Sequence, residues 1–316
     1  MTADIPQDIL SSPDDLPAGF RSGFVALVGR PNAGKSTLAN ALVGDKVAIT
    51  SDTPQTTRSR LRAIVDRDDM QVVLVDTPGL HKPRDPLGSE LNRSALGALA
   101  DVDVVCMLVD ASKPIGTGDA WVARQLQSVT APRLLVLSKS DLVGEKELRA
   151  QRDRAAELAA FDDVVALSAL SGDNLDTLLD ELCARLPEGP RWFPAGTTSD
   201  QPLEMLVAEF VREKVLGHTR DEVPYSVGVK VEDLTYDERR DLTSIWAVIY
   251  VERDSQKGII IGSGGRQIKQ IGTEARADLV RLLGGRVRLD LTVKVRRNWR
   301  RDVSLIHRLG YGDEDE

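Results

Sequence analysis

The sequence contains few of the residues on which small extracellular or metal-binding proteins depend. Of its 316 residues, two are cysteines, three are histidines and 4% are aromatic. Cys106 and Cys183 are far apart, and each lies in an apolar stretch, so their spacing supports neither a disulfide bond nor a metal site. We expect both to be buried thiols of a hydrophobic core. A chain of this length can bury the cores of about two domains without cross-links.

Long hydrophobic runs are also absent. No run approaches the roughly 18 apolar residues that a membrane-spanning helix needs. The first 20 residues contain four aspartates and no lysine or arginine, which is unlike a secretory signal peptide. We therefore expect a cytoplasmic protein.

The net charge of −8 is unevenly distributed along the chain. Residues 252–308 contain fourteen Lys and Arg against six Asp and Glu, so the remainder is strongly acidic. Because phosphates are neutralised locally, a basic carboxyl-terminal module fits a contact with nucleic acid. A solvated charged face explains the charge alone equally well.

The hydrophobic pattern predicts two domains. Short apolar runs that alternate with helix-like segments predict an α/β domain with a mostly parallel sheet. A proline-rich stretch follows, and after it the expected order changes to helix, strand, strand, helix, strand, typical of a smaller α+β domain. The expected parts are a disordered acidic leader (1–22), a first domain (23–186), a linker (187–202), a second domain (203–309) and an acidic tail (310–316). Expected strands lie at 24–28, 61–65, 72–75, 104–109, 134–137 and 164–167, and then at 226–231, 244–251 and 287–295.

A glycine-rich segment, residues 29–36, reads GRPNAGKS and lies between an expected strand and an expected helix. This context makes the match to the phosphate-binding pattern G-x-x-x-x-G-K-S specific. In such a loop, backbone N–H groups surround phosphate oxygens, the lysine reaches the β and γ phosphates, and the serine hydroxyl is placed for Mg²⁺. The sequence therefore predicts that Lys35 binds phosphate and that Ser36 binds Mg²⁺.

Two more motifs predict contacts to Mg²⁺ and the γ-phosphate. The sequence DTPG ends the expected strand at 72–75, so Asp76 can hold Mg²⁺ through water and the Gly79 amide can contact a γ-phosphate. The polar stretch QTTR contains Thr57, whose hydroxyl can complete the Mg²⁺ shell.

Two further motifs predict guanine as the base. The sequence SKSD, residues 138–141, resembles the guanine-specifying motif, since the Asp141 carboxylate can accept from both the N1–H and the N2 amine of guanine. The sequence SAL, residues 168–170, can set a backbone amide against guanine O6. Five motifs in the order that a GTPase requires are unlike a set of chance surface turns.

Leu80 and Ser138 depart from the usual GTPase pattern, and Asn32 is the candidate to replace part of what Leu80 lacks. Leu80 stands where Ras-type enzymes carry a glutamine that orients water, so hydrolysis cannot use that side chain. Resemblance to GTPases that share this Pro-Asn loop implies that Asn32 helps to hold a K⁺ near the phosphates, and a capping role within its own turn is the alternative. Ser138 replaces the usual asparagine of the guanine motif, and we expect its shorter side chain not to span to the phosphate loop in the same way.

A second glycine loop, Gly262-Ser263-Gly264-Gly265, precedes an expected helix near the carboxyl end. Loops without side chains at such positions let an RNA backbone approach closely, as in the GXXG loop of KH domains. Arg266 and Lys269 lie in the first turns of the following helix, where they can meet phosphates. A glycine-rich helix entry with ordinary solvated charges is the alternative.

Two tryptophans are ambiguous from sequence alone. Trp299 lies among arginines after the last expected strand, and it can either stack on a base or close a small core. Trp246 lies within an expected strand, and we expect it in the core.

Taken together, these motifs resemble the Era family of bacterial GTPases over nearly all of residues 23–309. The resemblance rests on the GRPNAGKS loop, the stretch TSDTPQTTR at 50–58, DTPGL at 76–80, and the run from VERDSQKGIIIG at 251–262 to VKVRRNWR at 293–300. It implies a Ras-like P-loop GTPase domain with a mostly parallel sheet, followed by a type II KH domain. It further implies binding near the 3′ end of small-subunit ribosomal RNA, as an assembly factor of the small ribosomal subunit.

The motifs and the resemblance together predict the ligands and the site residues. GTP and Mg²⁺ are the expected ligands, K⁺ is a further candidate, and a monomer is expected. Two alternatives remain open: an RNA-binding scaffold that uses GTP only as a loading ligand, and a regulatory GTPase bound peripherally to the inner face of the cell membrane.

The predicted catalytic residues are Asn32, Lys35, Thr57 and Gly79. The predicted nucleotide-binding residues are Gly29, Asn32, Ala33, Gly34, Lys35, Ser36, Thr37, Asp76, Gly79, Ser138, Lys139, Asp141, Ser168, Ala169 and Leu170. The predicted metal ligands are Ser36, Thr57 and Asp76, and the predicted RNA-binding residues are Gly262, Ser263, Gly264, Gly265, Arg266 and Lys269.

Overall fold

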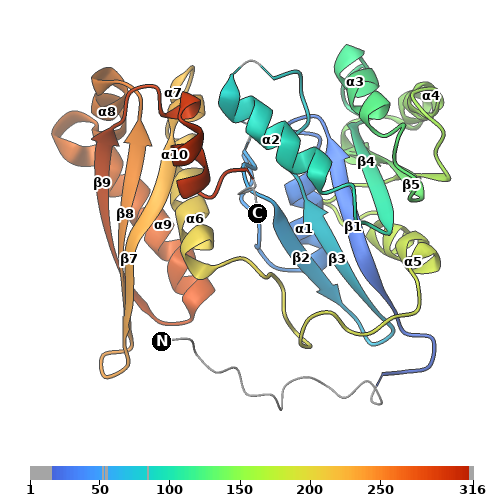
Figure 1. The fold of residues 1–316 in the computed structure, drawn as a ribbon, viewed down its shortest axis with the longest axis horizontal. Helices are drawn as coiled ribbons and strands as arrows, with labels where there is room; N and C mark the ends of the chain where they lie inside the picture. Colours follow the sequence, from blue (N-terminus) through green and yellow to red (C-terminus); the bar gives the residue numbers. More distant parts are fainter. Residues whose placement is uncertain (1–15, 52, 54–55, 84, 313–316) are drawn as a thin grey trace. The chain divides into compact units, whose positions relative to one another are not determined.

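The computed structural model describes residues 16–51, 53, 56–83 and 85–312 (Figure 1). Its contacts divide the chain into two compact units, each formed by segments that are separate in sequence. The first unit comprises Met1–Val47, Arg60–His81 and Ala95–Asp200, and the second comprises Ala48–Ser59, Lys82–Ser94 and Gln201–Glu316. The first fifteen residues, on which most of the predicted leader falls, lie outside the described residues.

The first unit is a six-stranded sheet with helices on both faces. The strand order is β2-β3-β1-β4-β5-β6, and every neighbouring pair is parallel except β2 and β3. Its central strands are almost continuously apolar because both of their faces are buried. The elements are β1 (Arg21–Gly29), α1 (Lys35–Val43), β2 (Leu61–Asp66), β3 (Met70–Asp76), β4 (Val104–Asp110), α3 (Thr117–Gln125), β5 (Arg133–Ser138), the 3₁₀ helix η3 (Ser140–Leu142), α4 (Glu145–Ala156), β6 (Asp163–Ala166) and α5 (Leu175–Arg185).

The core of the first unit lies against the two faces of this sheet. On one face, α3, α4 and the last turn of α2 (Pro86–Gly97) form an apolar cluster with β1, β4 and β5. Helices α1 and α5 pack on the other face (Figure 1). Cys106 of β4 is fully buried, as expected, and burial raises the pKa of its thiol to about 12. Cys183 is only partly buried.

The second unit is a three-stranded sheet of order β7-β8-β9. Strands β7 and β8 are antiparallel, whereas β8 and β9 are parallel and are joined by a helical crossover, as parallel strands require. The elements are α6 (Leu203–Gly217), α7 (Val223–Ser226), β7 (Gly228–Asp237), β8 (Leu242–Val251), α8 (Asp254–Ile261), η4 (Ser263–Gly265), α9 (Arg266–Leu283), β9 (Arg286–Val295), η5 (Trp299–Arg301) and α10 (Val303–Arg308). The expected α/β and α+β classes are therefore both confirmed.

The strand expected at 226–231 is placed wrongly. Ser226 ends the short helix α7, and β7 runs from Gly228 to Asp237. Pro224 lies at the start of α7, where its fixed φ favours a helical turn over a strand. Strand β7 is longer than expected because its pairing with β8 continues beyond a bulge between Val231 and Asp233, up to Asp237 opposite Leu242.

The two tryptophans of the second unit have opposite environments. Strand β8 alternates, and Ile245, Ala247 and Ile249 face α6 and α9. Trp246 has the opposite parity and is 41% exposed, so the expectation that it lies in the core is wrong. Trp299 is fully buried, and its indole N–H donates a hydrogen bond to the Ser226 carbonyl at 2.7 Å, which favours the core interpretation.

Among the described residues, no helix is long and apolar enough to cross a bilayer.

The tryptophan contrast gives a prediction about stability. Trp299→Phe removes buried volume and leaves the Ser226 carbonyl without its donor, so we expect a loss of about 2–4 kcal/mol in the free energy of unfolding. Trp246→Phe, at a half-exposed position, should cost less than about 1 kcal/mol. Urea unfolding followed by circular dichroism measures both. Equal losses would contradict the difference in burial.

Candidate functional site

The loop at residues 29–36 connects β1 to α1, and its backbone requires glycine at two points. A Cβ at Gly29 would lie 2.6 Å from the Leu108 carbonyl oxygen of the neighbouring strand, so a side chain does not fit there. Gly34 has φ +93° directly before the first residue of α1. Asn32 has φ 64°, in the left-handed region that asparagine tolerates better than most residues. The loop is therefore a close turn whose N–H groups and helix start lie together.

Lys35 is held inside this loop. Its side chain is buried, and its ammonium donates to the carbonyls of Gly29 at 3.4 Å and Arg30 at 3.3 Å. Burial lowers the pKa of Lys35, and the charge of Asp76 partly offsets that effect. A buried ammonium that is held mainly by neutral carbonyls is well placed to meet an anion.

Ser36 and Asp76 bring two oxygen ligands together. The Ser36 hydroxyl donates to the Asp76 carboxylate at 2.7 Å, and Asp76 is fully buried at the end of β3. A hydroxyl and a carboxylate oxygen beside a phosphate loop are the donor types that Mg²⁺ takes, together with water and phosphate oxygens. The residues present therefore fit this ion.

The segment after β3 lies against the phosphate loop. A Cβ at Gly79 would lie 2.7 Å from the Pro31 Cα, so only glycine allows this approach. The Leu80 N–H donates to the Gly29 carbonyl at 3.0 Å, and the Leu80 side chain is fully buried in the core. Leu80 therefore presents no polar group that could orient water, as its residue type predicts.

The expectation that the Ser138 side chain does not span to the phosphate loop is wrong. Its hydroxyl donates to the Ala33 carbonyl of the phosphate loop at 2.7 Å and lies 3.2 Å from the Val109 carbonyl, so the shorter side chain does reach the loop. It reaches because the loop packs closely on the end of β5, where a Cβ at Gly34 would lie 3.7 Å from the Ser138 hydroxyl. The contact expected of an asparagine is made here by serine.

Lys139 ties the base-recognition motif to the same loop. Its ammonium donates to the Asn32 carbonyl at 3.0 Å and to Asp110 at 2.7 Å. Burial would raise the pKa of Asp110, but hydrogen bonds from Lys139 and Ser112 outweigh it, so the pKa is lowered and the carboxylate stays charged. Asp141 follows in η3 and is exposed, with its carboxylate available to a ligand.

The sequence SAL at 168–170 lies beside this motif. Strands β5 and β6 are parallel neighbours, and the Ser140 N–H donates to the Leu167 carbonyl at 3.1 Å. Ser168 is buried, whereas Leu170 is 83% exposed. The structure thus brings the predicted residues of the loop, of β3 and of the β5 and β6 ends to one edge of the first sheet. Thr57 is the exception, because it belongs to the second compact unit.

The second glycine loop has the geometry that its composition predicts. Gly262, Gly264 and Gly265 all have positive φ, at 71°, 61° and 77°. A Cβ would meet nothing within 4 Å at Gly264 or Gly265, so the backbone there is open to an approaching ligand. Helix α9 begins at Arg266, whose side chain donates back to the Ser263 carbonyl at 3.3 Å.

A groove of about 1180 Å³ extends along α9 and β9. Hydrophobic side chains such as Ile268, Leu289 and Leu291 lie along it. Among the described residues, every charged one that lines it is basic; these are Lys269, Arg276, Arg286 and Arg288.

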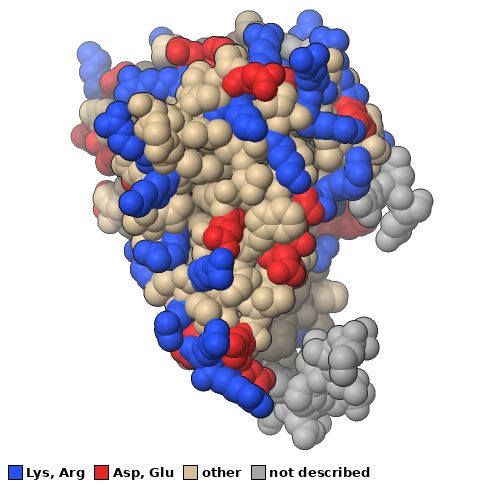
Figure 2. Space-filling view, turned by 90° about the vertical axis from the view of Figure 1, so that its left-hand side faces the viewer, with Lys and Arg blue, Asp and Glu red and all other residues tan. Residues whose placement is uncertain are grey.

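Of these four cations, only Lys269 was predicted from the sequence. Helical spacing from Lys269 to Arg276 and strand alternation from Arg286 to Arg288 were the signals that could have identified the rest. Figure 2 shows Lys and Arg side chains spread over the upper part and the edge of one face, with fewer Asp and Glu among them.

Two family models match the chain. The model described as 50S ribosome-binding GTPase matches residues 24–139, and the model described as KH domain matches residues 222–300. These spans lie in the regions that the sequence motifs assign to a nucleotide domain and an RNA-binding domain.

Similar proteins extend over nearly the whole chain. GTPase Era of Mycolicibacterium smegmatis is 48% identical over 297 residues, which are 92% of this chain and 99% of that protein. GTPase Era of Mycobacterium tuberculosis is 49% identical over 298 residues, with the same coverage.

Solved structures agree with this similarity. A variant of Aquifex aeolicus Era bound to GDP.AlF4⁻ is 35% identical, with a TM-score of 0.88 over 93% of this chain and 100% of that one. Era in complex with MgGDPNP and nucleotides 1506–1542 of 16S ribosomal RNA is 36% identical, with a TM-score of 0.90 and the same coverage. The chain therefore belongs to the Era family of GTPases, with a P-loop GTPase domain followed by a KH domain.

Proposed function

We propose that this protein hydrolyses GTP and binds small-subunit ribosomal RNA near its 3′ end as an assembly factor of the small subunit. One observation carries the proposal: a glycine loop with a buried lysine and a Ser36–Asp76 oxygen pair shares the chain with a basic groove beside an open GXXG-type loop. The Era relative solved with MgGDPNP and 16S ribosomal RNA supports both ligands.

The nucleotide is held by the loop and by the strand ends around it. Lys35 would contact the β and γ phosphates, and Ser36, Asp76 and Thr57 would hold Mg²⁺, whose positive charge would stabilise the charge on the phosphate oxygens. Asp141 recognises guanine, Lys139 supports the loop beneath it, and an amide of residues 168–170 faces guanine O6. Backbone groups of Gly29, Asn32, Ala33, Gly34 and Thr37 surround the phosphates.

Hydrolysis requires that a water be aligned without a glutamine at position 80. In the proposed mechanism the Gly79 N–H binds a γ-phosphate oxygen, and Asn32, whose φ is 64°, uses its side-chain oxygen to bind a cation. We propose K⁺ as that cation, which would supply positive charge as an arginine finger does. In this mechanism Asn32, Lys35, Thr57 and Gly79 are the catalytic residues.

The RNA strand lies on the second glycine loop and in the adjoining groove. Gly262, Ser263, Gly264 and Gly265 clamp the backbone, Arg266 and Lys269 meet phosphates, and the apolar side chains of the groove contact bases. The relative's RNA is a fragment of 16S ribosomal RNA, which supports this choice of nucleic acid.

Phosphate release under multiple turnover tests the enzymatic part of the proposal. GTP should be hydrolysed, and ATP should not. A protein that binds GTP tightly yet releases no phosphate, with or without RNA and K⁺, would instead be a scaffold that uses GTP as a loading ligand.

Base choice can be predicted from Asp141. Asp141→Asn should lose GTP and gain xanthosine triphosphate, because the amide restores the match of donor and acceptor with the altered base edge. Competition binding with the two nucleotides measures the exchange. The assignment fails if the unmodified protein binds ATP and GTP equally.

Asn32 gives a prediction about K⁺. Asn32→Gly accepts the positive φ without strain but lacks the side-chain oxygen, so we expect it to lose the K⁺ stimulation of hydrolysis while GDP affinity stays within a few-fold. Rates in matched K⁺ and Na⁺ buffers measure the effect. Full stimulation in this variant would assign Asn32 a role confined to the turn.

The groove gives a prediction about RNA. Arg276→Gln should weaken binding of single-stranded RNA and reduce the salt slope by roughly 0.7, the value for one phosphate contact. Arg281→Gln is the matched control, since Arg281 lies on the same helix, pairs with Asp278 and does not line the groove. Equal effects of the two changes on the salt slope would place the RNA elsewhere.

A further inference from the structure

Arg30, the second residue of the phosphate loop, is tied to helix α3 by an ion pair. Its guanidinium Nη1 lies 2.9 Å from the carboxylate of Asp119, whose side chain is only 7% exposed. The same carboxylate oxygen accepts the Gly116 N–H at 3.0 Å, so the start of α3 fixes its position. Both partners of the ion pair belong to the first compact unit.

The Arg30 side chain also lies directly against Gly118. A Cβ at Gly118 would lie 2.8 Å from the Arg30 Nε and 3.0 Å from the Arg30 Cδ. Gly118 lies in the first turn of α3 and does not have a positive φ, so its backbone conformation does not require glycine. The absence of a side chain instead leaves room for Arg30 to reach Asp119.

The main chain of Arg30 contributes to the phosphate site. Its carbonyl accepts from the Lys35 ammonium at 3.3 Å and from the Ala33 N–H at 3.2 Å. An ion pair that restricts the Arg30 side chain also restricts the backbone of Arg30, and with it the carbonyl that orients Lys35.

Other groups hold the remainder of the turn. Lys139 donates to the Asn32 carbonyl at 3.0 Å, and Ser138 donates to the Ala33 carbonyl at 2.7 Å. Asn32 has φ 64°, a conformation that surrounding contacts must maintain at a residue other than glycine. The Arg30–Asp119 pair holds the opposite end of this turn. A loop that is held at both ends loses less conformational entropy when it binds phosphate.

We propose that Asp119 is a positioning residue for nucleotide binding, which acts through Arg30 to hold the phosphate loop in the conformation that presents Lys35. The inference rests on the phosphate-binding role of Lys35 in the proposed function. Because GTP and GDP both carry a β-phosphate, the affinities for both should depend on the ion pair to the same extent.

Charge alone predicts a different result. Asp119 is an anion beside an anion-binding loop, so the loss of its charge would by itself tighten nucleotide binding, whereas the loss of the Arg30 charge would weaken it. A positioning role predicts that both changes weaken binding.

The test measures the affinity of the full chain for GDP and for a non-hydrolysable GTP analogue, in Mg²⁺, in Asp119→Asn, Arg30→Gln and the double variant. Asparagine keeps an oxygen for the Gly116 N–H but not the charge. We expect each single change to raise both Kd values about three- to fivefold, the scale of one partly exposed ion pair. The double variant should be no worse than either. Tighter binding by Asp119→Asn, or losses that add in the double variant, would overturn the inference.

Gly118→Ala separates positioning from stability. The added methyl group displaces Arg30 from Asp119, whereas alanine favours a helix over glycine. We expect GDP affinity to fall about threefold, with no loss in the free energy of unfolding measured in urea. Unchanged GDP affinity in Gly118→Ala and Asp119→Asn would overturn the inference.

Gly116→Ala is the matched control. A Cβ at Gly116 meets nothing within 4 Å, and alanine is a poorer N-cap than glycine. This change should therefore lower stability and leave GDP affinity unchanged. If GDP affinity instead falls in step with stability across the variants, the role of the ion pair is purely structural and the inference is wrong.

Lys35→Ala separates the inference from the proposed function. If Lys35→Ala abolishes GDP binding while the Asp119 and Gly118 variants bind as the unmodified protein does, only the positioning role fails. If Lys35→Ala binds GDP within a few-fold of the unmodified protein, the loop is not the phosphate site, and both the proposed site and the inference are wrong.

Discussion

The parallel pairing of β1 with β3 and β4 is the constraint on which the candidate nucleotide site depends. In this register Leu27 lies opposite Asp76, and Gly29 lies opposite Leu108. Parallel strands end at the same edge of a sheet, so the phosphate loop and the Asp76 carboxylate leave their strands side by side. The absence of a side chain at Gly29 allows the loop to turn against β4, and from there it meets Ser138.

The groove of the second unit depends on a similar constraint. Strands β8 and β9 are parallel, so the chain between them must cross over through α8 and α9. The glycine loop lies at the turn between these helices, and α9 then runs alongside β9. Cations from a helix and a strand thereby line one groove with apolar side chains between them, a combination suited to a strand of phosphates and bases.

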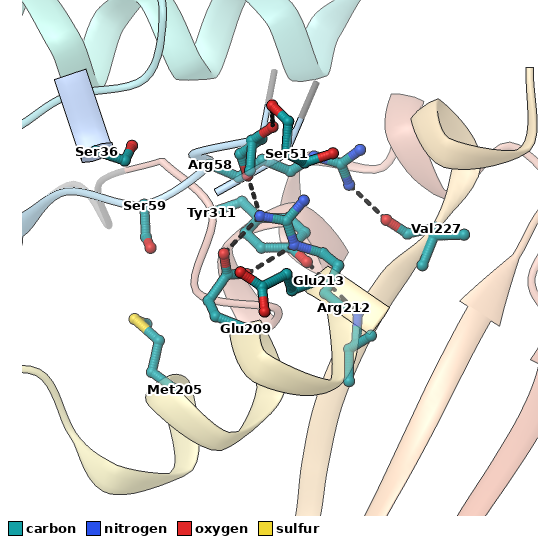
Figure 3. Close-up of polar contacts among 12 residues, drawn as sticks. Ser36, Ser51, Arg58, Ser59, Met205, Glu209, Arg212, Glu213, Val227 and Tyr311 are labelled. Carbon is teal, nitrogen blue, oxygen red and sulfur yellow. Dashed lines mark hydrogen bonds and ion pairs between the residues drawn. The ribbon is translucent and has the colours of Figure 1, made fainter. Parts of the chain in front are cut away.

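Arg58 and Arg212 of the second unit (Figure 3) are both buried, which is costly for a charged side chain. A hydrophobic residue in place of Arg58 would avoid burying a charge beside Arg212. The Arg58 guanidinium instead donates to three main-chain carbonyls at the end of α7, and Arg212 donates to the Thr56 carbonyl. The cluster joins α6, α7 and the carboxyl-terminal segment, which are distant in sequence.

The sequence by itself determined the features whose requirements are local. A glycine needed for a tight turn, a lysine and hydroxyl at the start of a helix, and an apolar run long enough for a buried strand can all be recognised from neighbouring residues. For this reason both fold classes were predicted correctly, and each glycine loop lies where the sequence places it, directly before a helix.

Only the tertiary structure decided the features that depend on distant residues. Ser138 reaches Ala33 because two strand ends pack closely, although the residues are about a hundred positions apart. Arg276 and Arg288 line one groove, Trp246 faces outward and Arg58 is buried. In each case sheet register and helix packing determine which residues surround the side chain. Charge and hydrophobicity in a sequence indicate what a side chain can do, but burial and partners come from segments that meet only after folding.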